Sequence, residues 1–317
     1  MTSWQILVVG TLPDEVRAAF DSAFSARFVG SLSSSDEAAT LSAQKDAVVA
    51  TIDTRMDRAW FAALSPSVKA VATYSVGTEH IDLAAARERG IAVLNTPDVL
   101  SDSVAEVAVF LMIGAARRAT ESIALIRSRN WPGWSPVQLN GMELCGKTLG
   151  IFGMGRIGRA IAERASAFGM TIHYHNRSRL PQDQEKRAVY FDSLEGLLAT
   201  SDVVMLAAPA TAETVGLFDQ SRLALLRPGA ILVNISRGNV VDDDALIAAL
   251  ESGRLLAAGL DVFNREPNLD PRYFDLPNVF MLPHIGSSTR EARLRMGQVL
   301  IDGLRMLAQG RAPSNRV

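Results

Sequence analysis

The sequence predicts an α/β protein with two domains, each built around a parallel β-sheet covered by helices. Short β-rich runs alternate along the chain with Ala- and Leu-rich helical runs, and strands separated by helices usually pair in parallel. The alternation forms two successive series. A length of 317 residues is also enough for two domains of roughly 150 residues each.

The first series lies in the N-terminal third of the chain. We expect strands at residues 6–9, 47–50, 70–73 and 92–94, where Val, Ile and Ala predominate. Ala-rich runs at residues 15–20 and 83–88 predict helices between them.

The second series begins near residue 149. Its predicted strands are residues 149–152, 171–175, 203–206, 231–235, 257–260 and 280–282, and its predicted helices are residues 156–167, 194–198 and 245–251. Gly169, Gly229 and Gly253 stand where helices should stop, because glycine readily adopts the left-handed conformation that ends a helix.

Two longer helical runs define the domain boundaries. Residues 101–119 read as one helix that carries the chain into the second domain, with Ser101 or Asp102 able to cap its start. Residues 289–309 read as another helix, which we expect to pack back against the first domain. The predicted domains are therefore a discontinuous one, residues 1–99 plus 286–317, and a continuous one, residues 100–285.

Composition and charge favour a soluble cytoplasmic protein. The 32 basic and 34 acidic residues nearly balance, which argues against a nucleic-acid partner. The N-terminus has no basic leader. The longest apolar run, residues 107–116, is shorter than the ~20 residues that cross a bilayer, so no membrane partner is expected. Cys145 is the only cysteine, and we expect a small buried residue there rather than a catalytic thiol.

A glycine-rich turn between a predicted strand and helix indicates a dinucleotide site. It runs Gly153, Met154, Gly155, Arg156, Ile157, Gly158. Gly153 permits a tight turn, Gly155 lets backbone N–H groups approach a pyrophosphate, and Gly158 lets the helix pack close to the sheet. The helix N-terminus adds a partial positive charge that favours phosphate.

The end of the next strand bears on the choice of cofactor. An NAD enzyme usually places Asp or Glu there to bind the ribose 2′-OH, whereas this chain has Asn176, followed by Arg177, Ser178 and Arg179. A carboxylate would repel a 2′-phosphate and these residues would bind one. We therefore predict a preference for NADP(H), with NAD(H) possible. The alternative is a solvated basic turn, which is common at strand ends.

Three residues suggest the reacting end of the site. Arg237 follows a buried strand and can hold a carboxylate while polarising an adjacent ketone. His284 follows another strand and is the candidate proton donor, with Glu266 as the carboxylate that favours its charged form. An isolated arginine or histidine would more often be structural, but this combination favours reduction of a 2-keto acid.

The remaining titratable residues carry no such context. We treat His80, His173 and His175 as structural or surface residues, and no pattern calls for a metal. Asp242, Asp243 and Asp244 precede a predicted helix, so capping is their expected use.

Taken together, these residues resemble the D-isomer-specific 2-hydroxyacid dehydrogenase family over essentially the whole chain. The matching segments are residues 75–82, 95–106, 153–158, 236–242, 259–263, 266–267 and 283–287. The resemblance implies two Rossmann-like or flavodoxin-like domains with the active site in the interdomain cleft, and usually a homodimer. The chain departs from the pattern that is common in this family at Asn264 and at residues 207–209.

The resemblance also implies roles for individual residues. Arg237 binds and polarises the substrate. His284 acts as acid and base, and Glu266 holds the His284 ring and favours its charged form. The backbone N–H groups of Val76 and Gly77 bind the substrate carboxylate. The further implied cofactor contacts are Asp261 at the nicotinamide end, Ser103 at the phosphates, and Pro209 and Ser236.

Within the family, Trp131, Trp134 and the Asn176 segment look like the glyoxylate/hydroxypyruvate reductase branch. One tryptophan lines the substrate pocket, from the same or a partner subunit, or packs in a dimer interface. The expected reaction is NAD(P)H-dependent reduction of a small 2-keto acid to the D-2-hydroxy acid. Two alternatives stay open: a reductase for a bulkier acid such as 2-ketogluconate or an aryl pyruvate, and a dinucleotide-sensing corepressor-like protein.

Overall fold

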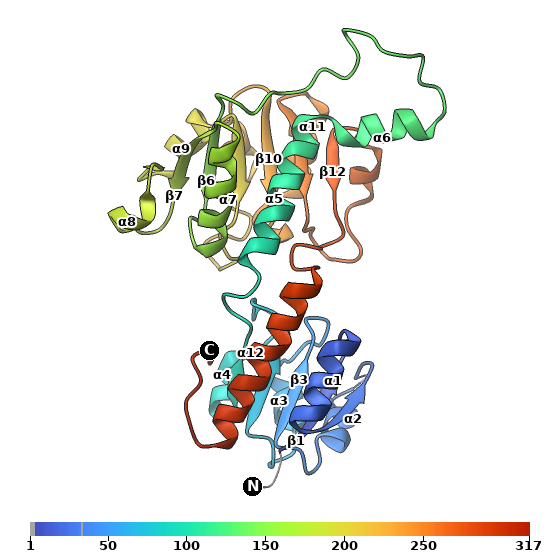
Figure 1. Ribbon diagram of the computed structural model, residues 1–317, viewed down its shortest axis with the longest axis vertical. Coiled ribbons are helices and arrows are strands. Elements are labelled where there is room, and N and C mark those ends of the chain that lie inside the picture. The colour runs from blue at the N-terminus through green and yellow to red at the C-terminus, as the bar shows by residue number, and fades with distance from the viewer. Residues whose placement is uncertain (1–3, 33) are drawn as a thin grey trace. The chain divides into compact units, whose positions relative to one another are not determined.

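The computed structural model describes residues 4–32 and 34–317, which form two compact units, each with its own sheet (Figure 1). One unit contains the residues up to Leu100 together with Ser287–Val317, and the other contains Ser101–Gly286. Every pairing between the named strands is parallel, and helices cover both sheets. The predicted α/β class with two parallel sheets is confirmed.

The first unit has five strands in the order β2-β1-β3-β4-β5. The strands are β1 (Gln5–Val9), β2 (Ser25–Val29), β3 (Ala47–Ala50), β4 (Ala70–Thr73) and β5 (Ala92–Leu94). The helices are α1 (Asp14–Ala23), α2 (Ser35–Leu41), α3 (Arg58–Ala63), α4 (Leu83–Glu88) and α12 (Arg290–Ala308). Gly297 of α12 packs against Val16 of α1, and α2, α3 and α4 contribute to a core on the other face of the sheet (Figure 1).

The second unit has seven strands in the order β12-β11-β10-β9-β6-β7-β8. They are β6 (Thr148–Phe152), β7 (Thr171–His175), β8 (Val189–Tyr190), β9 (Val203–Leu206), β10 (Ala230–Asn234), β11 (Leu255–Leu260) and β12 (Val279–Met281). The order reverses between β6 and β9. Because ligands of open α/β sheets bind beyond the carboxyl ends of the strands at such a reversal, this edge is where a site is expected.

Helices cover both faces of the seven-stranded sheet. The unit's helices are α5 (Ser101–Ala116), α6 (Ala119–Arg127), α7 (Arg156–Ala167), α8 (Gln182–Glu185), α9 (Leu194–Thr200), α10 (Gln220–Leu223) and α11 (Asp243–Glu251). Gly259 of β11 touches Leu111 of α5 on one face, and Gly150 of β6 touches Leu197 of α9 on the other. Burial on both faces explains why the central strands β9 and β10 are buried along their whole length, whereas β7, nearer the edge, alternates between buried and more exposed residues.

Several elements differ from the sequence prediction. The helix predicted at residues 101–119 ends at Ala116, and α6 starts a new direction after Arg118, whose φ is +54°. Arg118 forms an ion pair with Glu121, and the Thr120 hydroxyl donates to the carbonyl of Val279. These contacts redirect the chain without glycine or proline.

Several smaller elements were not predicted. They include the edge strand β2, the edge strand β8, and the helices α2, α3, α6, α8 and α10. Gly169 and Gly253 follow helices as expected, but Gly229 lies in the turn before β10. Cys145 is exposed, so the expectation that it is buried was wrong. Among residues 4–32 and 34–317, no helix combines the length and apolar character needed to span a bilayer.

Candidate active site

The glycine turn after β6 lies at the reversal of strand order. Gly153 has φ +100°, and a Cβ there would lie 2.4 Å from the backbone nitrogen of Ala208, which follows β9. A Cβ on Gly158 would lie 2.3 Å from the carbonyl oxygen of Gly153. Neither position can hold a side chain without moving backbone. These two glycines therefore allow the loops after β6 and β9, and helix α7, to meet.

Gly155 is different, because it faces open space. A Cβ there would meet nothing within 4 Å, and the residue is the N-cap of the twelve-residue helix α7. Arg156 and Ile157 form the first turn of that helix. The first N–H groups of a helix have no partner within the helix. An open cradle at such a terminus fits the pyrophosphate of a dinucleotide.

Asn176 ties the end of β7 to this turn. Its side-chain oxygen Oδ1 accepts a hydrogen bond of 2.6 Å from the backbone N–H of the buried Met154. Arg177 and Ser178 are exposed immediately beyond it. Arg179 instead pairs with Glu185, with Nε 2.8 Å from Oε1, and lies over the ring of Tyr190. Both arginines of the predicted basic cluster are exposed, but Arg179 is paired with a carboxylate of its own unit.

Three neighbouring strands carry the other predicted residues. Arg237, Glu266 and His284 follow β10, β11 and β12, which are adjacent in the sheet. Because all three strands are parallel, their carboxyl ends share one edge, and that edge also carries the glycine turn.

His284 and Glu266 are in direct contact. The imidazole Nδ1 lies 2.7 Å from Glu266 Oε2, and Glu266 Oε1 accepts a 2.7 Å hydrogen bond from the backbone N–H of Phe263. Burial raises the pKa of the Glu266 carboxyl. The hydrogen bonds from His284 and Phe263, with the charges of His284 and Arg237, outweigh that effect, so its pKa lies below the ordinary value. Glu266 is therefore an ionised partner for the ring.

The backbone of His284 is held in an unusual conformation. Its φ is +52°, in the left-handed region that few non-glycine residues adopt. The buried carboxylate of Asp261 accepts 2.8 Å hydrogen bonds from the N–H groups of Ile285 and Gly286. Burial raises the pKa of Asp261, and those two hydrogen bonds oppose the rise. Asp261 thus fixes the segment directly after His284.

Arg237 is fixed by a buried residue that sequence reasoning missed. The Asn234 amide nitrogen donates to the Arg237 carbonyl at 2.9 Å, and its Oδ1 accepts from the Ser236 N–H and hydroxyl. An asparagine within an otherwise apolar predicted strand was the available signal in the sequence. Gly238 follows, and a Cβ there would lie 1.9 Å from the carbonyl carbon of Phe263. The arginine loop and the glutamate loop therefore touch.

The predicted carboxylate-binding loop belongs to the other unit. The Ser75 hydroxyl donates to the Gly77 carbonyl at 2.7 Å, and the Asn95 amide donates to the Val76 carbonyl at 2.8 Å. Among the described residues, neither the Val76 nor the Gly77 backbone N–H donates to a protein acceptor. This loop presents two N–H groups that an anion can use.

The other residues that were predicted to contact the cofactor differ in how deeply they are buried. Ser103 and Ser236 are buried, and Pro209 is exposed with its carbonyl accepting from the Thr214 hydroxyl. Asp242 caps α11 through the Ala245 N–H, as predicted, whereas Asp243 and Asp244 lie in the first turn of that helix and contact Tyr273 and Arg272.

The other histidines have structural partners. They are His80 with Thr73, His173 with Thr200 and His175 with the Phe191 carbonyl. In the part of the chain that is described, no three or more His, Cys, Asp or Glu side chains are placed so that they could hold a metal ion together.

The strand order and the glycine turn at its reversal define a Rossmann-type dinucleotide-binding protein. The family model for the D-isomer specific 2-hydroxyacid dehydrogenase NAD binding domain matches residues 109–286. The chain belongs to the D-isomer-specific 2-hydroxyacid dehydrogenase family.

Individual relatives point the same way. The chain is 44% identical over 276 residues to the glyoxylate reductase of Thermococcus litoralis, covering 86% of this chain and 83% of that protein. It is 43% identical over 274 residues to the glycerate dehydrogenase of Hyphomicrobium methylovorum, covering 85% of each. The NADPH-dependent glyoxylate/hydroxypyruvate reductase of Sinorhizobium meliloti, solved with NADP and malonate, superposes with a TM-score of 0.89 at 32% identity, covering 100% of this chain and 97% of that one.

Proposed function

We propose that this protein reduces a small 2-keto acid, of the glyoxylate or hydroxypyruvate type, to the D-2-hydroxy acid with a nicotinamide dinucleotide. The observation that carries the proposal is the 2.7 Å contact between His284 Nδ1 and Glu266 Oε2 on the sheet edge that also bears Arg237 and the glycine turn. The relatives named glyoxylate reductase and glycerate dehydrogenase support the same substrate class.

The protein residues have separable roles in this reaction. The bound dinucleotide would supply the hydride. Arg237 holds the substrate carboxylate and polarises the ketone, and the N–H groups of Val76 and Gly77 bind the same carboxylate. His284 uses Nδ1 to face Glu266, which leaves Nε2 to deliver a proton to the ketone oxygen. The ionised Glu266 holds the ring in this orientation and complements the positive charge of a ring that donates a proton.

We propose that NADP(H) is preferred and that NAD(H) is also accepted. Asn176 puts a neutral amide where a carboxylate would repel a 2′-phosphate, and it is held there by Met154. Because Arg179 is engaged by Glu185, Arg177 and Ser178 are the better candidates for a 2′-phosphate. The remaining proposed dinucleotide contacts are Gly153, Met154, Gly155, Arg156, Ile157, Gly158, Ser103, Pro209, Ser236 and Asp261.

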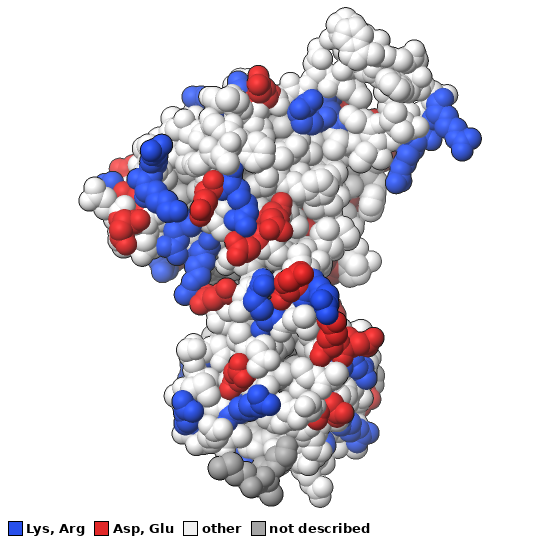
Figure 2. Space-filling view, in the orientation of Figure 1, with Lys and Arg blue, Asp and Glu red and all other residues white. Residues whose placement is uncertain are grey.

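We also propose a homodimer in the cytoplasm, in which the continuous unit binds the dinucleotide and the discontinuous unit binds the substrate carboxylate. The segment around α6 exposes apolar side chains, Phe110, Ile123, Ile126, Trp131, Trp134 and Val137. Figure 2 shows the loop that follows α6 as largely uncharged. An exposed apolar patch of this kind is typical of a protein–protein interface. Its tryptophans are thus candidates for interface packing or for a partner's pocket.

The test is the loss of NADPH and NADH absorbance at neutral pH with glyoxylate, hydroxypyruvate, 2-ketogluconate and an aryl pyruvate. We expect rapid turnover of NADPH with one or both of the two small acids. Turnover with a bulkier acid alone would change the substrate and keep the mechanism. Absence of turnover with all four would contradict the proposal.

A further inference from the structure

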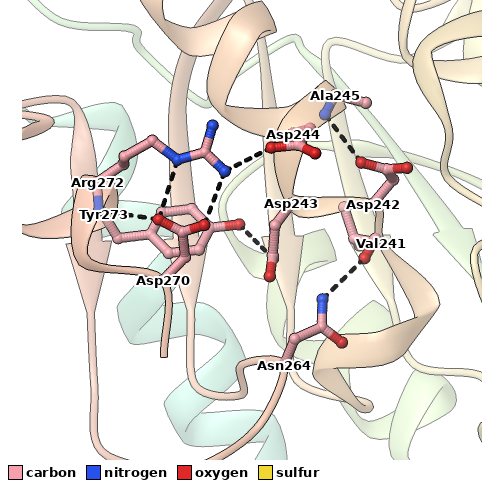
Figure 3. A network of polar contacts seen from close by, with 9 residues as sticks. All are labelled: Val241, Asp242, Asp243, Asp244, Ala245, Asn264, Asp270, Arg272 and Tyr273. Carbon is pink, nitrogen blue, oxygen red and sulfur yellow. Dashed lines mark hydrogen bonds and ion pairs between the residues drawn. The ribbon is translucent and has the colours of Figure 1, made fainter. Parts of the chain in front are cut away.

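We infer that Arg272 and Tyr273 are positioning residues for the reaction: together with the aspartates at the start of α11 they clamp the loop that carries Glu266, and so set Glu266 against His284. This inference rests on the proposed function. The clamp connects two segments that are far apart in sequence, residues 241–245 and residues 264–273, and Figure 3 shows their contacts.

Arg272 joins the two segments by charge. Its Nη2 lies 2.5 Å from Asp244 Oδ1 and 2.7 Å from Asp270 Oδ2, and its Nε donates to Asp270 Oδ1 at 3.0 Å (Figure 3). Asp270 also accepts the backbone N–H of Arg272. One planar guanidinium therefore bridges the start of α11 to the turn that follows the Glu266 loop.

Tyr273 adds a neutral contact beside the charged one. Its hydroxyl donates to Asp243 Oδ1 at 2.7 Å (Figure 3). Its ring is buried, with its centroid 6.0 Å from that of the Phe263 ring. Burial and the hydrogen bond to Asp243 raise the pKa of Tyr273, so it stays a donor across the working pH range. A buried hydroxyl with one well-placed acceptor restricts the loop to one position.

The loop is also anchored on the other side of Glu266. The Asn264 amide nitrogen donates to the Val241 carbonyl at 3.2 Å (Figure 3). Phe263 also lies against Gly238. Glu266 therefore lies between two anchored stretches, residues 263–264 and 272–273. Both are fastened to the segment that directly follows Arg237, so the same contacts set the glutamate loop relative to the arginine loop.

If Arg272 only stabilised the fold, its loss would have a different effect on turnover from the one that a positioning role predicts. The Arg272 side chain is 48% exposed, and ion pairs that are half exposed contribute little to folding. Loss of Arg272 should then change turnover no more than loss of any similar pair. Displacing a catalytic carboxylate by a fraction of an ångström is costly, because hydrogen bonds to the reacting groups depend steeply on distance.

The chain offers a matched control in Arg227. Its side chain is 46% exposed and its Nη1 lies 2.9 Å from Asp202 Oδ1, in the same unit but before β10 rather than after it. We expect Arg272→Ala to lower kcat for reduction about tenfold with little change in KM for NADPH. The fall of kcat with rising pH should also begin at lower pH. Arg227→Ala should change neither. Equal behaviour of the two variants would overturn the inference.

A double mutant tests whether the clamp acts through Glu266. Tyr273→Phe keeps the ring and removes only the hydroxyl, and it should shift the pH profile in the same direction as Arg272→Ala. In a Glu266→Gln background the same change should have much less effect, because the carboxylate charge that the clamp positions is gone. Additive effects on kcat and pH profile would show that the clamp acts elsewhere and would contradict the inference.

A spectroscopic readout separates this inference from the proposed function. The chain has four histidines, so the low-field proton NMR signal of the His284 Nδ1–H can be assigned by its loss in His284→Ala. In Arg272→Ala we expect this signal to move upfield or broaden, and in Arg227→Ala to stay. An unchanged signal in Arg272→Ala would overturn the clamp. Failure of all four 2-keto acids in the wild-type protein would overturn the proposed function and leave this measurement valid.

Discussion

His284 Nδ1 lies 2.7 Å from Glu266 Oε2, although 18 positions separate the two residues in the chain. The contact orients the ring, because the nitrogen that faces the carboxylate cannot also face the substrate. It also joins two loops that leave adjacent strands, β11 and β12.

Replacing His284 with Ala should lower kcat for 2-keto acid reduction by roughly 10²–10⁴-fold, because the ketone oxygen loses its proton donor. The KM for NADPH should change little. His173→Gln is a suitable control, since His173 contacts Thr200 beside β7 rather than the Arg237 edge. Steady-state kinetics measure both values, and unchanged turnover in His284→Ala would contradict the role of His284 as proton donor.

Glu266→Gln should confine reduction to lower pH than in the wild-type protein. The wild-type carboxyl has a lowered pKa, so it is ionised at neutral pH and places a negative charge 2.7 Å from the imidazole Nδ1. The neutral amide keeps a hydrogen-bond acceptor but loses that charge. Profiles of kcat between about pH 5 and 9 measure the shift, and overlapping profiles would contradict the assigned role of Glu266.

The same lowered pKa predicts a pH-dependent contribution to stability. A group whose pKa is depressed by folding stabilises the folded state above its unfolded pKa, which for Glu is about 4.3. The contribution is lost as pH falls through the folded value. The difference in urea midpoint between wild type and Glu266→Gln should therefore be constant near neutral pH and shrink below about pH 4. A difference in urea midpoint that grows as the pH falls would contradict the lowered pKa of Glu266.

Asn176→Asp should shift cofactor choice toward NADH. The aspartate can keep the hydrogen bond that Oδ1 accepts from the Met154 N–H, so the loop should not change. It adds a charge that repels a 2′-phosphate and accepts from a ribose 2′-OH, and one charged hydrogen bond is worth roughly 10- to 150-fold. The ratio of kcat/KM for NADPH to that for NADH measures this. Arg179→Ala, whose guanidinium is paired with Glu185, should change the ratio less.

The apolar segment after α6 should hold two copies of the chain together. Trp134 is 84% exposed and Val137 is 80% exposed, and a charge at either position would be costly in a buried interface. We expect sedimentation of the wild-type protein as a dimer and of Val137→Asp as a monomer at low micromolar concentration. Leu225→Asp, on an exposed position outside this segment, should remain dimeric. Sedimentation of the wild-type protein as a monomer would contradict the proposed homodimer.

Local sequence patterns were sufficient for the interior strands. Residues 47–50, 70–73 and 203–206 are continuously apolar or nearly so, and they form β3, β4 and β9 with the predicted ends, because strands buried on both faces admit few polar side chains. The edge strand β2 was missed because it is half exposed and its residues, Ser25–Val29, alternate without an apolar run. The break at Arg118 was also invisible, since it depends on contacts with Glu121 and Val279.

For the candidate site, too, some features could be predicted from the sequence and others depended on the tertiary structure. The residue types and their places after strands were readable from the sequence, because a glycine turn, an arginine and a histidine each have local signatures. Tertiary structure decided which groups meet. Arg179 turns to Glu185, Asp261 holds the backbone beyond His284, and Arg272 reaches back to Asp244. Such contacts depend on the order of strands in the sheet and on packing between loops, and neither is encoded in the spacing of residues along the chain.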